Sequence, residues 1–225
     1  MSRVVRAVLV ALIGLAAAAP ARAHHVGAYV PRDNDVSANF KQIKFSTQAG
    51  KFDVGLRLYA DGALRKALRA QAANLPPGLD GAILAALRAG DAAAVEAGLM
   101  VFFAALVRDL ALEADRQLAD VQTPPAARVA GGAKILEAIW RYYNLVDFAV
   151  SQRDPKAATA VRLSFDEAEG YAKAQTPAPE RMRAPLTRIA RILTGVIAAA
   201  SPPARNAGGV RGGSPPSITR NAGGV

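Results

Sequence analysis

Apolar residues recur at helical spacing through most of the chain, and the clearest case is the stretch 133–172. In its first half, apolar side chains occupy most of the helix circumference. The polar residues fall on one narrow line, at steps of three or four: Lys134, Glu137, Arg141, Asn144, Asp147 and Ser151. This pattern predicts a central helix that other helices cover on most sides. Asp154 and Pro155 suit the N-cap and first position of a second helix, so we expect a helical hairpin here.

Upstream of this hairpin, helical periodicity is interrupted several times by residues that end helices. The breaks lie at Ala49-Gly50-Lys51, Asp61-Gly62, Leu75-Pro76-Pro77-Gly78 and Gly90. Asp91 is placed to cap a long helix over 92–118. A weak repeat links this helix to the second helix of the hairpin, because Asp91 and Phe102 recur 63 residues later as Asp154 and Phe165. The sequence therefore predicts an all-α protein: a bundle of about five or six helices between residues 34 and 173, assembled from helical hairpins.

The first 23 residues have the features of a secretory signal peptide. Arg3 and Arg6 precede an apolar run over 7–19, and Ala21-Arg22-Ala23 forms a small-x-small cleavage site. A run of this length is too short to span a bilayer. We expect export, cleavage after Ala23 and a periplasmic bacterial location, with the bundle domain over 24–175.

The character of the chain changes after residue 175. Residues 182–200 could form an amphipathic helix with four arginines on one side, docked weakly or not at all on the bundle. Contact of this helix with an anionic membrane surface is a second, less favoured expectation. Residues 201–225 consist mainly of Pro, Gly, Ala and Arg. We expect this C-terminal tail to be disordered, because it cannot bury enough apolar area to offset the entropy of ordering.

Net charge and cysteine content exclude several classes of function. The chain carries a formal charge of +10 and no cysteine. The balance over residues 24–175 is only +1, and the excess of arginine lies at the two ends. A basic stripe on the folded body, which nucleic-acid binding requires, is therefore not expected. Without cysteine there is no disulfide, thiolate zinc site or iron–sulfur cluster.

The two histidines of the chain, His24 and His25, would become the mature N-terminus after cleavage. A terminal amine and an imidazole together can chelate a transition metal, with copper or iron as the candidates. Asp33 and Asp35 would add oxygen ligands. The alternative is a flexible start of the chain that happens to contain two histidines.

A second candidate site lies on the helix predicted over 133–153. Trp140, Tyr143, Asn144 and Asp147 would line a cleft between helices, where Asp147 would contact a cation or a partner. The simpler interpretation is that the aromatic residues pack in the core. Likewise, an ordinary surface ion pair explains the spacing of Arg162 and Asp166. Asp147 and Glu167 are carboxylates on which acid–base catalysis would depend, but no histidine lies within the predicted fold to complete a nucleophilic triad.

Three segments resemble the periplasmic helical domains of bacterial iron permeases and imelysin-like iron-uptake proteins. They are Ile139-Trp140-Arg141-Tyr142-Tyr143, Arg153-Asp154-Pro155 and Ser164-Phe165-Asp166-Glu167-Ala168. The stretch Ala49-Gly50-Lys51-Phe52-Asp53, ahead of Leu56 and Tyr59, resembles tetratricopeptide repeats. The glutamate-rich permease motif and the imelysin His-x-x-Glu motif do not occur in the chain, so the first resemblance implies a helical fold and metal-related partners without a set of iron ligands.

These observations favour an exported, non-enzymatic helical accessory protein. It would bind an envelope protein, in a metal-handling or redox complex. The alternative is a protein that binds a transition metal directly through His24 and His25.

Overall fold

The structure, a computed structural model, describes residues 32–200, and all of its regular elements are helices. Eight α-helices follow one another in the described part of the chain: α2 (Asp35–Gln48), α3 (Phe52–Ala60), α4 (Ala63–Ala70), α5 (Leu79–Ala89), α6 (Ala92–Ala119), α7 (Pro125–Arg153), α8 (Pro155–Ala172) and α9 (Pro179–Ala200). A short 3₁₀ turn, Ala72–Asn74, lies between α4 and α5. The all-α prediction is confirmed. The predicted number of helices is too low, because the glycine breaks produce separate short helices and α9 belongs to the bundle.

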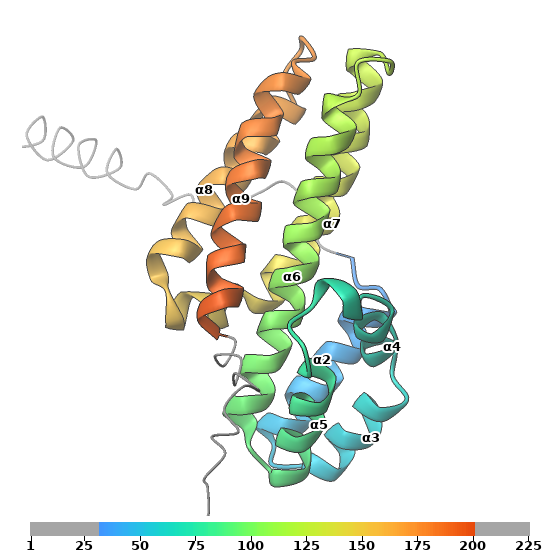
Figure 1. The fold of residues 1–225 in the computed structure, drawn as a ribbon, viewed down its shortest axis with the longest axis vertical. Helices are drawn as coiled ribbons and strands as arrows, with labels where there is room; N and C mark the ends of the chain where they lie inside the picture. The colour runs from blue at the N-terminus through green and yellow to red at the C-terminus, as the bar shows by residue number, and fades with distance from the viewer. Residues whose placement is uncertain (1–31, 201–225) are drawn as a thin grey trace, which may run out of the picture.

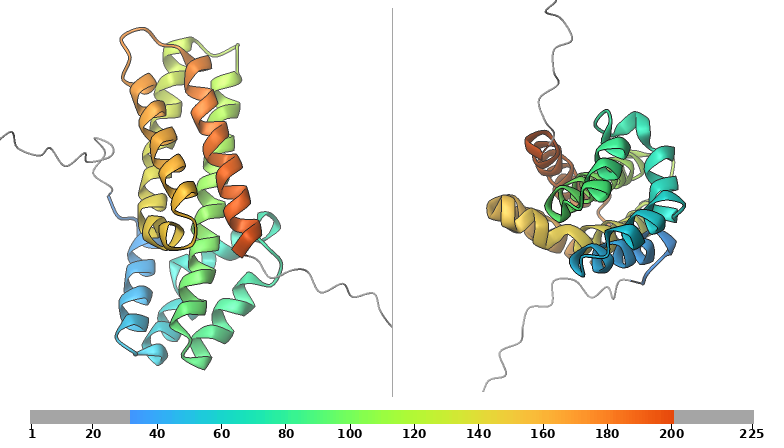
Figure 2. Two further views of the ribbon diagram at one scale, coloured as in Figure 1. Left: turned by 90° about the vertical axis from the view of Figure 1, so that its left-hand side faces the viewer. Right: turned by 90° about the horizontal axis from the view of Figure 1, so that it is seen from below.

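Helix α6 is the axis of the molecule (Figure 1). Its C-terminal part forms a four-helix bundle with α7, α8 and α9, in which each helix packs against the next and α9 returns to α6 (Figure 2). The shorter helices α2 to α5 gather around its N-terminal part (Figure 1), with α5 packed directly on α6 and α2 on α3 and α4. The two halves of the protein therefore share one helix.

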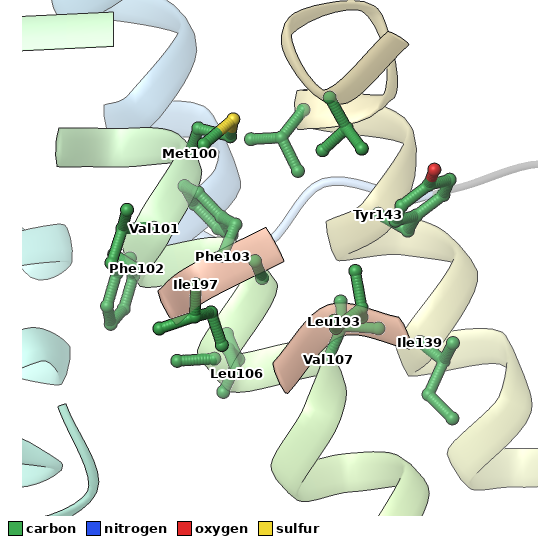
Figure 3. Close-up of a cluster of buried hydrophobic side chains, with 14 of the residues drawn as sticks. Met100, Val101, Phe102, Phe103, Leu106, Val107, Ile139, Tyr143, Leu193 and Ile197 are labelled. Carbon is green, nitrogen blue, oxygen red and sulfur yellow. The ribbon is translucent and has the colours of Figure 1, made fainter. Parts of the chain in front are cut away.

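The most enclosed helix is α6, and not the stretch 133–153 that the polar stripe predicts to be central. Nine consecutive residues of α6, from Leu99 to Val107, are buried. In α7, by contrast, the Phe148 side chain is 65% exposed and Leu145 is only partly buried. Figure 3 shows side chains of α6 meeting Ile139 and Tyr143 of α7 and Leu193 and Ile197 of α9. The prediction of α7 as the central helix was wrong, because apolar residues around a helix do not by themselves show which other helices pack against it.

Local capping signals in the sequence fix the helix starts. The Asp91 carboxylate accepts a hydrogen bond from the Ala94 amide at 2.9 Å, and the Asp154 carboxylate accepts one from the Ala157 amide at 2.8 Å. Both caps were predicted, and Asp154 is the single residue between α7 and α8. Asn34 and Ser37 form a reciprocal capping box at the start of α2.

Helix α7 begins at Pro125, eight residues before the predicted hairpin, and continues through Gly131 and Gly132. A Cβ atom at Gly132 would lie 3.1 Å from the Leu118 side chain and 3.3 Å from Met182. Glycine at this position therefore allows α7 to approach α6 and α9 closely. The glycine pair serves packing and does not end the helix.

The expectation of weak docking for residues 182–200 is wrong, because α9 is a full member of the bundle. Its apolar face, including Met182, Leu186, Ile189 and Leu193, is completely buried. The same face would have to meet lipid in a membrane-surface helix, and in this structure it contacts α6 and α8 instead. The predicted signal peptide at 1–23, His24, His25 and the tail at 201–225 lie outside the described residues.

Replacing Leu193 with alanine should lower the free energy of unfolding by about 2–5 kcal/mol, because the substitution leaves a cavity between α9 and the other helices of the bundle. Urea denaturation followed by circular dichroism measures this change. The control is Arg191→Ala on the exposed side of the same helix, for which we expect a change within about 0.5 kcal/mol. Equal stabilities of the two variants would mean that α9 is not part of the core.

Candidate functional site

The four predicted partner-binding residues divide into two buried and two accessible side chains. Trp140 is 9% exposed and packs against Phe165 of α8, with ring centroids 4.7 Å apart. Tyr143 is 1% exposed. Asn144 is exposed, and Asp147 is partly exposed. The two aromatic residues are therefore core residues, and only Asn144 and Asp147 can meet a partner directly.

Asp147 is held by Arg162 of α8 in a two-pronged ion pair. The Arg162 Nε lies 2.9 Å from Asp147 Oδ1, and its second nitrogen lies 2.6 Å from Oδ2. This hydrogen bonding raises the pKa of the Arg162 guanidinium. Spacing within the sequence predicted an ion pair between Arg162 and Asp166, and the structure shows that Arg162 reaches across to Asp147 of α7. The pair ties α7 to α8 at the surface.

Next to this ion pair, the Tyr143 hydroxyl is buried close to the Asp147 carboxylate. Burial raises the pKa of the phenol, and the negative charge of Asp147 raises it further. Tyr143 therefore stays protonated.

Two large apolar side chains flank the pair on the outside, Phe148 at 65% and Leu163 at 63% exposed. Each directly follows one member of the pair, so each is rotated by about 100° around its helix axis. Because α7 and α8 run in opposite directions (Figure 2), both side chains turn to the same side. The sequence contained a signal for this: Phe148 lies four residues after Asn144, on the polar line of α7.

The predicted metal ligands within the described residues are Asp33 and Asp35. Asp33 accepts hydrogen bonds from Lys41 at 2.8 Å and from the Ser37 hydroxyl at 3.0 Å, and these contacts hold its pKa below the usual value. Asp35 is exposed in the first turn of α2. Among residues 32–200, no three His, Cys, Asp or Glu side chains gather closely enough to hold a metal ion. A metal site here would depend on His24 and His25.

The carboxylates considered for acid–base chemistry are also engaged in ion pairs. Glu167 binds Arg188 of α9 at 2.7 Å and accepts a hydrogen bond from the Tyr171 hydroxyl at 3.3 Å. Asp147 and Glu167 are thus each bound to a different arginine, and each links two helices of the bundle.

A polar cluster that sequence reasoning missed lies among α3, α4 and α5, with Asp80 at its centre. Its carboxylate accepts hydrogen bonds from the buried Tyr59 hydroxyl at 2.9 Å, from Arg65 at 2.8 and 3.2 Å, and from Arg69 at 3.0 Å. Burial alone would raise the pKa of Asp80, but these hydrogen bonds outweigh it and hold the pKa below its usual value. Burial and the bond to Asp80 raise the pKa of Tyr59. The three donor residues lie on other helices than Asp80, 11 to 21 residues before it, so no spacing within one helix indicates them.

Comparison of the chain with protein-family models, with curated proteins and with solved structures finds no match. Within residues 32–200, no helix combines the length and the apolarity needed to cross a membrane.

Replacing Asp80 with asparagine should lower the free energy of unfolding by about 1.5–3 kcal/mol at neutral pH, because charge-assisted hydrogen bonds to Arg65 and Arg69 are lost. The folded-state pKa of Asp80 lies below its unfolded value, so this stabilisation is present above about pH 4 and disappears as the pH falls further. Urea denaturation at several pH values measures both effects.

The control for this prediction is Asp53→Asn, which removes an exposed ion pair with Arg57 at the i,i+4 spacing. It should change stability by no more than about 0.5 kcal/mol. If Asp80→Asn and Asp53→Asn had equal effects, the Asp80 cluster would not hold α3, α4 and α5 together.

Proposed function

We propose that the protein is an exported, non-enzymatic helical scaffold that binds an envelope protein through the outer face of α7 and α8. We call this surface the α7/α8 face and define it by Asn144, Asp147, Phe148, Arg162 and Leu163. The observation that supports the proposal is the exposure of Phe148 and Leu163, which each directly follow one member of the Asp147–Arg162 pair and turn to the same side of the two helices.

The α7/α8 face has the composition of a binding surface. Aromatic and apolar anchors at the centre of an interface contribute most of the affinity, and polar groups around them fix orientation. Here the ion pair is already formed within the protein, so a partner need not desolvate an unpaired charge on this side. The exposed Asn144 amide would add a directional hydrogen bond one helical turn from Phe148.

The buried aromatic residues under this face support it without touching the partner. Trp140 packs on Phe165, and together they join the two helices that carry Phe148 and Leu163. A rigid base of this kind lowers the entropy that the anchors lose on binding. Following the resemblance to iron-uptake proteins, we place the partner in a metal-handling or redox complex.

The double variant Phe148→Ser/Leu163→Ser should abolish or weaken partner binding by at least about tenfold, because it removes both apolar anchors. A tagged copy of each protein is purified from the native host after chemical cross-linking, and the co-purifying envelope proteins are identified by mass spectrometry. Binding of the identified partner is then measured with purified proteins.

Phe45→Ser is the matched control, because Phe45 is 68% exposed and lies on α2, outside the α7/α8 face. It should bind the partner as the wild type does. The proposal fails if no envelope protein co-purifies, or if the double variant and Phe45→Ser retain the partner equally well.

A further inference from the structure

A groove separates α2 from the first two turns of α6, on a different surface from the α7/α8 face. The two helices meet where Phe40 packs edge-on against Phe103, with ring centroids 5.0 Å apart. Towards the N-terminus of α6, the residues that line the space are Ala92 and Ala93, which are too small to fill it. The result is an open cavity of about 240 Å³.

The groove has an apolar floor and a charged rim. Phe40, Val95 and Leu99 are buried and form the floor. At the rim, Lys44 of α2 faces Glu96 of α6, and both side chains are partly exposed. One opening thus combines an apolar surface, a cation and an anion.

The rim charges are only loosely bound to each other. Lys44 Nζ and Glu96 Oε1 are 3.9 Å apart, beyond hydrogen-bond distance. A partly exposed ion pair at this separation contributes little to stability, so a ligand can separate the two groups at small cost. Each group then remains available for a charge-assisted hydrogen bond.

We propose that this groove binds a free apolar α-amino acid, of the class of leucine or phenylalanine. The ligand carboxylate would meet Lys44 and its ammonium group would meet Glu96, while its side chain would lie on the apolar floor. The volume corresponds to about eight water-sized groups at ~30 Å³ each, which suits a molecule of this size. Drug-sized ligands occupy larger pockets, from about 300 Å³ upwards.

Charge complementarity selects a zwitterion over other small amphipathic ligands. A fatty acid would place its carboxylate beside Glu96, and an apolar amine would place its ammonium group beside Lys44. A neutral apolar molecule would cover both charges and satisfy neither, at a cost in desolvation. A zwitterion with one apolar arm pairs with both.

The test is a titration of the full mature protein with L-phenylalanine and L-leucine, followed by NMR chemical shifts of the groove residues. On the wild-type protein, N-acetyl-L-phenylalanine and L-phenylalaninamide each lack one ligand charge and should bind about tenfold more weakly. Lys44→Met and Glu96→Gln should each weaken phenylalanine binding by a similar factor. Both side chains are partly exposed, so the fold should persist, and urea denaturation verifies it.

Two further variants separate the groove from the rest of the molecule. Ala93→Leu fills the groove at an exposed helical position and should abolish binding with both charges intact. Phe148→Ser/Leu163→Ser should bind phenylalanine normally, so this inference and the proposed function succeed or fail separately. The proposal is overturned if the groove resonances do not shift at saturating amino acid. It is equally overturned if N-acetyl-L-phenylalanine and L-phenylalaninamide bind the wild-type protein as tightly as L-phenylalanine does. The same holds if Lys44→Met and Glu96→Gln bind L-phenylalanine as tightly as the wild-type protein does.

Discussion

The constraint on which the structure depends is the burial of α6 on all sides between Leu99 and Val107. Nine consecutive residues cover more than two helical turns, so no single neighbouring helix can shield them. Each side of α6 must therefore be covered by a different group of helices. The bundle of α7, α8 and α9 and the smaller group α2 to α5 meet this requirement together (Figure 3 shows the bundle side of the cluster).

On two surfaces of this arrangement, apolar side chains lie beside an ion pair. The first is the groove between α2 and α6, where the alanine-rich start of α6 leaves space beside Phe40. The second is the α7/α8 face, where the outward turn of Phe148 and Leu163 leaves apolar side chains in solvent. The ion pairs Lys44–Glu96 and Asp147–Arg162 mark these surfaces with charge. We propose ligand and partner binding at these surfaces because each combines apolar side chains with an ion pair.

Features that depend on residues close together in the sequence could be predicted from it. Features that depend on contacts between different helices could not. The caps at Asp91 and Asp154 are local hydrogen bonds, and the sequence shows them directly. The role of α9 was missed because an apolar face lined by arginines suits a core helix and a membrane-surface helix equally well. The Asp147–Arg162 pair and the Asp80 cluster join different helices, and only the packing brings these side chains together.

Hydrogen–deuterium exchange along α6 tests the central claim most directly, because α6 is the helix that both halves share. The account predicts that the amides from Leu99 to Val107 exchange most slowly, and only through global unfolding. It also predicts that the protected amides of α2 to α5 and of α7 to α9 share this opening free energy. Protection of α7 to α9 alone, with α2 to α5 exchanging by a separate low-energy opening, would contradict a core that depends on both halves.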